Sequence, residues 1–369
     1  MAKDFRERQK FVRDLGSIGE IVRLDASAFD IRTGLRGAAF TTTPFVIGLA
    51  TGHPEAVIAT LGALFLTNTE GPRAVALPLR ILIIACFTEA AAFGLGTLVG
   101  TTDLLAIPLV GIGVFGALMV AGRQGWTSVG TFTAIAFAVG VGLPGGSTAA
   151  AGQRVWLSLI GALWAFLGAS VERALGSHGA SAATSVTPQA SKPGHEFYSQ
   201  RPRPSILSLQ SGALSHDTAV GVASAVGLSI GLALGLPRDF WIIVTIIITV
   251  RPNVGSTIRL TSMMVMGTIA GAVIAAAITL EVGDLYFLAA LLFGFYALAF
   301  ATRGVNLGLV QVFLTPSIII LLNILYPGHW QLAETRVLDV VIGGAMAVPA
   351  VYLLGVKAFV NSLGWRREH

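Results

Sequence analysis

Four charged side chains stand inside long apolar runs of this sequence, where a charge needs a partner or water. They are Glu89, Arg154, Arg336 and Asp339. A guanidinium can hold a carboxylate bidentately, and a carboxyl group in a low-dielectric site can carry a proton near neutral pH. Because burying a charge in hydrocarbon costs at least about 2.5 kcal/mol, the four positions are candidates for an anion or proton pathway.

The two arginines differ in their helical neighbours. Arg336 and Asp339 are three positions apart, so on a helix they share a face and can pair. Arg154 has Leu157 at that spacing, which predicts that its field remains available to attract an anion. Asp339 could therefore be only the counter-ion of Arg336, or it could carry a proton.

Arg154 and Glu89 each allow more than one interpretation. Arg154 could snorkel from the outer end of its helix or pair with Glu55 or Asp103. Glu89 stands near the middle of its apolar run and is the second candidate proton carrier. It is also the acid that could compete for Arg154 when a substrate leaves, although the two positions differ in depth.

Four further polar residues could line the same pathway. Arg80 and Arg259 lie near predicted inner helix ends, where anchoring at the membrane surface is the simpler interpretation. Asn306 and Gln311 fall in one predicted span, where they can hydrogen-bond between helices or contact a ligand.

Composition places these residues in a membrane. The chain has 369 residues, 54% of them hydrophobic and 12% charged, which is too little polar surface to cover a soluble globule. Residues 1–27 are charged throughout and lack the apolar core of a secretory signal; their periodicity suits an interfacial amphipathic helix or a solvated helical tail. The single cysteine, the scattered histidines and the absence of a Walker sequence give no reason to expect a disulfide, a metal, a cofactor or ATP-driven transport.

A spanning helix needs about 20 mostly apolar residues, and this rule predicts about twelve spans. The second and eighth are short and could be tilted spans or re-entrant segments. The predicted segments are 34–52, 56–69, 80–100, 104–122, 127–143, 153–171, 217–236, 239–250, 260–280, 285–302, 306–326 and 335–355.

Basic residues orient this layout. With a cytoplasmic N-terminus, 21 of the 24 lysines and arginines fall on the cytoplasmic side, which is a strong positive-inside bias; the other three are Arg154, Arg238 and Arg336. The stretch 248–262 is then a tight cytoplasmic turn. Arg251 and Arg259 would flank it, with Pro252 fixing φ and Gly255 permitting the reversal.

Several landmarks recur about 180 positions apart, which indicates an internal duplication. Gly52-His53-Pro54 corresponds to Gly235-Leu236-Pro237, and Gln153-Arg154-Val155 corresponds to Thr335-Arg336-Val337; Asp103 with Asp284 and Arg123 with Arg303 follow the same offset. An even number of spans gives both copies the same orientation. The predicted fold is an all-α integral membrane protein of about twelve transmembrane helices, arranged as two parallel six-helix repeats.

The duplication also divides the chain. Residues 28–171 form the first transmembrane repeat and residues 216–356 the second. Residues 172–215, rich in Ser, Ala, Pro and Gly, form a cytoplasmic linker, and residues 357–369 form a cytoplasmic tail.

Two stretches carry a family resemblance. "GLPRDFWIIVTIIITVRPNVGSTIRLTSMMVMGTIAGAVI", residues 235–274, resembles the signature of the fusaric acid resistance (FUSC) family of aromatic acid exporters: an apolar helix after a Trp, a Pro/Gly turn, an Arg-bearing helix start and a Gly-rich helix. "ETRVLDVVIGGAMAV", residues 334–348, resembles the last helix of that family, with Arg336, Asp339 and Gly343 in register. The first half matches only through its weaker duplicate.

The resemblance extends to plant aluminium-activated malate transporters, which are similar to one half-unit and are anion channels that pair two six-helix subunits around a pore. It implies that one duplicated chain carries both halves of a pathway. The short linker differs from the sizeable cytosolic domain of many larger exporters.

From the residues and the resemblance we expect a transporter of the bacterial inner membrane, with both termini cytoplasmic. It would export organic anions, in particular aromatic carboxylates, coupled to protons. A passive anion channel and a non-transporting membrane scaffold are the alternatives. An enzyme is not expected, because no nucleophile–base pair or metal set is present. The expected partners are a small organic anion and membrane lipid, with no nucleic acid, and the expected state is a monomer of two fused repeats or a homodimer.

Overall fold

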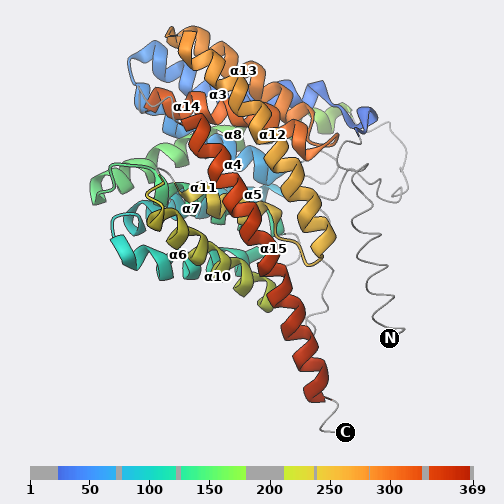
Figure 1. The fold of residues 1–369 in the computed structure, drawn as a ribbon. Helices are drawn as coiled ribbons and strands as arrows, with labels where there is room; N and C mark the ends of the chain where they lie inside the picture. Colours follow the sequence, from blue (N-terminus) through green and yellow to red (C-terminus); the bar gives the residue numbers. More distant parts are fainter. Residues whose placement is uncertain are drawn as a thin grey trace.

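The computed structural model describes residues 24–71, 77–121, 126–179, 212–236, 239–281, 283–325 and 332–365, and this part of the chain is all-helical (Figure 1). It contains twelve α-helices, as predicted. They are α3 (Ile31–Thr51), α4 (Val57–Glu70), α5 (Leu79–Val99), α6 (Ala106–Ala121), α7 (Thr127–Gly142), α8 (Thr148–Gly179), α10 (Gly212–Ala233), α11 (Phe240–Thr249), α12 (Val254–Glu281), α13 (Leu285–Ala301), α14 (Leu307–Leu325) and α15 (Leu332–Trp365). Short 3₁₀ turns at Ala26–Ala28, Pro54–Ala56 and Asp103–Leu105 complete the described elements.

Seven of the described helices are long and apolar enough to cross a membrane, so the chain is a multi-pass membrane protein. They are α5, α6 with the turn before it, α8, α10, α12, α14 and α15. Helices α7, α11 and α13 are apolar but shorter. The count of twelve helices is therefore confirmed, whereas the count of twelve full spans stays a prediction.

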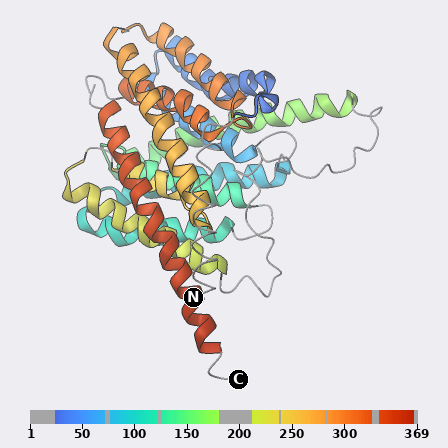
Figure 2. The same cartoon turned by 45° about the vertical axis from the view of Figure 1, so that its right-hand side comes forward.

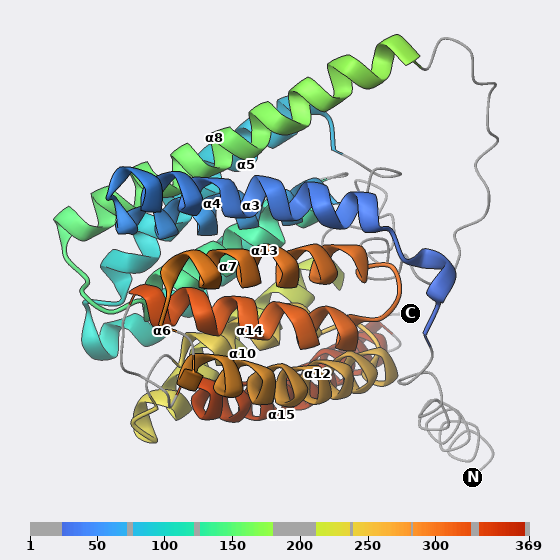
Figure 3. The same cartoon turned by 90° about the horizontal axis from the view of Figure 1, so that it is seen from above.

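The helices run side by side in one bundle, and Figure 3 shows them from the side. Within the first half, α5 packs along α7 and α8, and α4 packs along α8. Within the second half, α12 packs along α14 and α15, and α11 packs along α15. The halves interlock, because α3 packs along α13 and α10 packs along α6.

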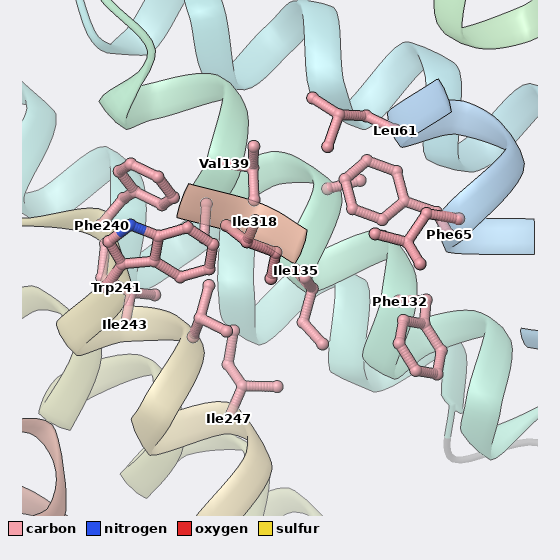
Figure 4. Close-up of a cluster of buried hydrophobic side chains, with 14 of the residues drawn as sticks. Leu61, Phe65, Phe132, Ile135, Val139, Phe240, Trp241, Ile243, Ile247 and Ile318 are labelled. Atoms are coloured by element: carbon pink, nitrogen blue, oxygen red, sulfur yellow. The ribbon is translucent and has the colours of Figure 1, made fainter. Parts of the chain in front are cut away.

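The two shortest helices lie in the protein interior. Every residue of α4 except Asn68 is buried, and so is every residue of α11 except Ile248. Protein on all sides removes the need for these helices to span a lipid core by themselves. Their apolar side chains form a central cluster with those of α7 and α14, shown in Figure 4: Leu61, Phe65, Phe132, Ile135, Val139, Phe240, Trp241, Ile243, Ile247 and Ile318.

The structure corrects the predicted turn at residues 248–262. Helix α11 ends at Thr249 and α12 begins at Val254, six residues earlier than predicted, so Gly255 is helical and does not make the reversal. The turn is held instead by Thr257, whose hydroxyl bonds the backbone N–H and C=O of Arg251 at 2.9 and 3.2 Å. Asn253 accepts the N–H of Ser256 at 3.3 Å, an Asx-type contact at the helix start.

The last helix of each half is longer than predicted. Helix α8 continues to Gly179, into the predicted linker, and α15 continues to Trp365, into the predicted tail; both reach beyond the other helices in Figure 2. Helix α10 begins at Gly212, four residues before the predicted second repeat. Most of the predicted N-terminal segment and linker, and the last residues of the tail, lie outside the described residues.

Candidate functional site

The candidate site is built around Arg336, near the start of α15. Its side chain is buried, and the carbon of its guanidinium lies 4.0 Å from the centre of the Trp241 ring on α11. Arg336 Nε and Nη1 have no hydrogen-bond partner among the described residues. The ring face stabilises the cation, but it leaves these donors unsatisfied, so the guanidinium retains capacity to bind an anion.

Two buried carboxyl groups accompany Arg336. Asp339 follows one turn later on α15, has no exposed surface, and finds no hydrogen-bond partner for either oxygen in the described part of the chain. Asp239, immediately before α11, is also buried and interacts electrostatically with Asp339. Arg336 and Asp339 share a helix face and interact electrostatically, although Asp339 accepts no hydrogen bond from Arg336.

Arg154, the arginine that the predicted duplication relates to Arg336, is hydrogen-bonded to other residues of the protein. One of its terminal nitrogens, Nη1, donates to Thr97 Oγ1 at 3.1 Å and to the Leu143 carbonyl at 3.2 Å; Nη2 donates to the Pro144 carbonyl at 2.5 Å. Leu143 and Pro144 directly follow α7, so Arg154 satisfies carbonyls at a helix C-terminus, where a cation is favoured. These acceptors are neutral, so they occupy donors of Arg154 without neutralising its charge, and the attraction of an anion to Arg154 stays a prediction.

The alternative partners suggested for Arg154 lie elsewhere. Glu55, in the turn after α3, pairs with His53 at 3.0 Å. A hydrogen bond from its own backbone and the neighbouring His53 hold the pKa of Glu55 below its usual value. Asp103 is exposed in its turn, with a φ of 48°. Arg154 instead stabilises the C-terminal end of α7.

A chain of contacts connects the two arginines. Gly142 ends α7 just before the carbonyls that Arg154 binds, and it lies against the ring of Phe240. Phe240 packs on Trp241 with ring centroids 4.4 Å apart, and Trp241 supports Arg336. Both predicted arginines thus adjoin the same junction between the halves, although only Arg336 has hydrogen-bonding capacity left.

Glu89 lies apart from this junction. It is buried in the middle of α5, where Oε1 accepts a hydrogen bond from Thr69 Oγ1 of α4 and Oε2 has no hydrogen-bond partner among the described residues. Thr97, the α5 contact of Arg154, is eight residues further along, which is about 12 Å of helix. Glu89 and Arg154 share no hydrogen bond in the described part of the chain, and the competition of Glu89 for Arg154 stays a prediction.

A charged cluster at the opposite end of the first half was not predicted from the sequence. Glu70, which ends α4, pairs with Arg36 of α3 and with Arg173 of α8, the latter at 2.9 Å. Arg36 also pairs with Glu172 at 2.5 Å. These four residues are called the cytoplasmic cluster below, after their predicted side. The available signal was that all four fall at predicted cytoplasmic helix ends.

The other predicted site residues do not join the Arg336 site. Arg80 is exposed in the first turn of α5, and Arg259 is half-buried in the second turn of α12. Asn306 precedes α14 and accepts the N–H of Gly308 at 2.6 Å, which is a capping contact. Gln311 is buried on α14 against Gly267 of α12, with Oε1 lacking a hydrogen-bond partner among the described residues.

The described residues include no group of three or more His, Cys, Asp and Glu side chains that could hold a metal ion. What the arrangement at Arg336 offers is a cation with unsatisfied donors, an aromatic wall and buried acids. Such a set can recognise a carboxylate attached to an apolar or aromatic body.

Comparison with known proteins identifies part of the chain. Residues 223–350, which include α11 to α14 and the Arg336 site on α15, match the family model described as fusaric acid resistance protein-like. None of the curated proteins and none of the solved structures matches the chain. Residues 223–350 of this multi-pass membrane protein are therefore similar to the fusaric acid resistance protein-like family.

Proposed function

We propose that the protein exports organic anions, specifically aromatic carboxylates, across the bacterial inner membrane in exchange for protons. The observation that carries this proposal is Arg336: a buried guanidinium on an aromatic ring, with Nε and Nη1 lacking hydrogen-bond partners among the described residues. A buried cation in this state is stabilised by an anion that supplies the missing acceptors. The match of residues 223–350 to a resistance protein family agrees with a transport role.

The surroundings of Arg336 favour an aromatic substrate. Phe240 and Trp241 pack on each other beside the guanidinium, offering aromatic surface next to the charge. Asp339 and Asp239 place negative charge nearby. In the empty site this charge balances Arg336, and it weakens the hold on a bound carboxylate so that the substrate can leave.

The proposal includes a pathway between two repeats of the chain. The contacts of α3 with α13 and of α10 with α6 support this, because in each case the first helix of one half packs along the fourth helix of the other half. Backbone geometry supports it as well. Gly52 and Gly235 both have positive φ, 77° and 61°.

Close packing also recurs at the duplicated positions. Gly161 of α8 lies against the Ala59 carbonyl, and Gly343 of α15 lies against the Ile242 carbonyl. Gly161 and Gly343, and likewise Ala59 and Ile242, are separated by the offset of the predicted duplication. The first half lacks the anion site because Leu157 stands in place of Asp339 and Ile58 in place of Trp241.

The test is transport by purified protein in liposomes. Radiolabelled benzoate, salicylate and cinnamate are followed with an acidic lumen, against protein-free liposomes. Wild type is compared with Arg336→Gln and with the double variant Arg336→Gln/Asp339→Asn, which removes both charges and so avoids stranding Asp339 as an unpaired buried acid. We expect both variants to lose at least about 90% of transport, the tenfold loss that about 1.4 kcal/mol of binding energy represents.

The outcomes separate the alternatives. Transport that needs Arg336 but ignores the pH gradient would indicate a passive anion channel. No transport and no thermal stabilisation by any of the anions would favour a scaffold. Full transport by a well-folded double variant would show that Arg336 is not the anion site.

A further inference from the structure

We propose that Glu89 is the proton carrier of the transport cycle, in the half of the molecule that lacks the anion site. This proposal rests on the proposed function, which needs a proton site and leaves it unassigned. In one conformation the Glu89 carboxyl takes up a proton from the outer side. In the other it releases that proton to water on the cytoplasmic side and becomes a carboxylate.

Burial and hydrogen bonding single out Glu89. It is 1% exposed and stands at the eleventh of the 21 residues of α5. Thr69 Oγ1 donates to Oε1, while Oε2 has no hydrogen-bond partner and no described cation forms an ion pair with the carboxyl group. A single hydroxyl is too little to stabilise a buried carboxylate, so in this conformation Glu89 holds a proton.

Few titratable side chains lie on the helices that pack against α5. Helices α6 and α7 have no titratable side chain, and α4 has only Glu70. Helix α8 contributes Arg154 at one end, and Glu172, Arg173 and His178 at the other. On α5 itself, Cys86 lies one turn away and Arg80 is exposed.

Glu70 is close in sequence to the Thr69 contact but unsuited to the same role. Its carboxylate is paired with Arg36 and Arg173. Glu89 has no such cation, so its protonation can change with its surroundings. Glu70 of the cytoplasmic cluster directly follows Thr69 in α4. The proposed exit for the proton therefore lies at that end of the helix.

The packing gives a physical connection between Glu89 and the anion site. Helix α5 lies along α7, with Gly96 against the Phe137 carbonyl. Helix α7 ends at Gly142 against Phe240, which packs on the Trp241 ring under Arg336. A shift of α7 that exposes Glu89 would therefore also move the wall of the anion site.

The experiment compares two modes of transport in liposomes, with benzoate as the probe. Acid-driven accumulation requires proton release and uptake, whereas exchange of labelled for unlabelled benzoate at equal pH does not. Glu89→Gln keeps an acceptor for Thr69 but cannot titrate. We expect it to retain exchange within about twofold of wild type and to lose accumulation at least about tenfold. Glu55→Gln, in an exposed turn, is the matched control and should keep both modes.

The results distinguish the two proposals. Wild type that shows no exchange would defeat the proposed function, whereas Glu89→Gln that accumulates benzoate like wild type would defeat the role of Glu89 alone. A readout on the unmutated protein covers the case in which the variant does not fold. Dicyclohexylcarbodiimide adds to protonated carboxyl groups in apolar surroundings without a leaving group. Mass spectrometry should find Glu89 modified more at low pH, and a Glu89 that stays unmodified at every pH would overturn the proposal.

Discussion

Gly142, the last residue of α7, lies directly against the ring of Phe240, the first residue of α11. This contact joins the helix end that Arg154 stabilises to the aromatic pair that supports Arg336. Two arginines at positions of the predicted duplication therefore have different contacts at one junction. One holds a helix end in place, and the other keeps unsatisfied donors.

The Gly142 contact predicts a specific packing defect. A methyl group at this position would overlap Phe240, so Gly142→Ala should destabilise the protein by about 1 to 3 kcal/mol and reduce benzoate binding. Gly152→Ala on α8 is the control, because nothing lies within 4 Å of the added methyl group. Thermal unfolding in detergent, with and without benzoate, measures both effects. Equal melting temperatures of the two variants would contradict the contact.

Arg154→Gln should act on stability before it acts on transport. It removes the donors to the Leu143 and Pro144 carbonyls, and a buried acceptor left without a donor costs about 1 to 3 kcal/mol. The melting temperature should fall, while the folded fraction keeps its benzoate affinity within about threefold, which is less than 1 kcal/mol. A stable variant without transport would instead restore the anion-attracting role that the sequence suggested for Arg154.

The cytoplasmic cluster predicts unequal effects of two similar substitutions. The Glu70 side chain is 6% exposed and pairs with Arg36 and Arg173, whereas the Glu172 side chain, which pairs with Arg36, is 33% exposed. Glu70→Gln should therefore cost about 3 to 5 kcal/mol, the range for breaking a buried pair, and Glu172→Gln less than about 1 kcal/mol. Chemical unfolding of both variants measures the difference. Similar losses would show that burial does not set the strength of these pairs.

The charge distribution predicts the sidedness of the membrane topology. In a Cys86→Ala background, Ser147→Cys should react with an impermeant thiol reagent from outside the cell, because residue 147 follows an odd number of predicted spans. Ser181→Cys should react only after the membrane is opened, because it falls in the predicted linker. Reaction of both from outside would contradict the even number of spans in the first half and the parallel repeat.

Local patterns in the sequence predicted the helices well and their ends less well. Apolar runs of helical length gave twelve segments, and twelve helices are present in the described residues. The start of α12 was misplaced by six residues, because Pro252 and Gly255 were both assigned to the turn. A polar side chain closes that turn, since Thr257 bonds the backbone of Arg251, and such a contact is not visible as a composition signal.

The candidate site was predicted as residues but not as an arrangement. Arg336, Asp339 and Glu89 were identified because a charge in an apolar run is costly wherever it lies. Trp241 was quoted only as part of a family pattern, and the cytoplasmic cluster was missed. Their partners come from other helices, 95 positions away for Trp241 and Arg336, and sequence spacing along one helix carries no information on such pairs.

The sequence by itself determined that this is an all-helical membrane protein with rare charges at costly positions, because hydropathy and helix length depend only on local composition. Only the tertiary structure decided which arginine is available. Arg154 meets the end of α7 and is hydrogen-bonded there, whereas Arg336 meets the face of Trp241, which stabilises its charge but accepts no hydrogen bond from Nε or Nη1. The same side chain on two different helices thus has different hydrogen-bonding capacity, because its donors are satisfied by whatever acceptors lie opposite it in space.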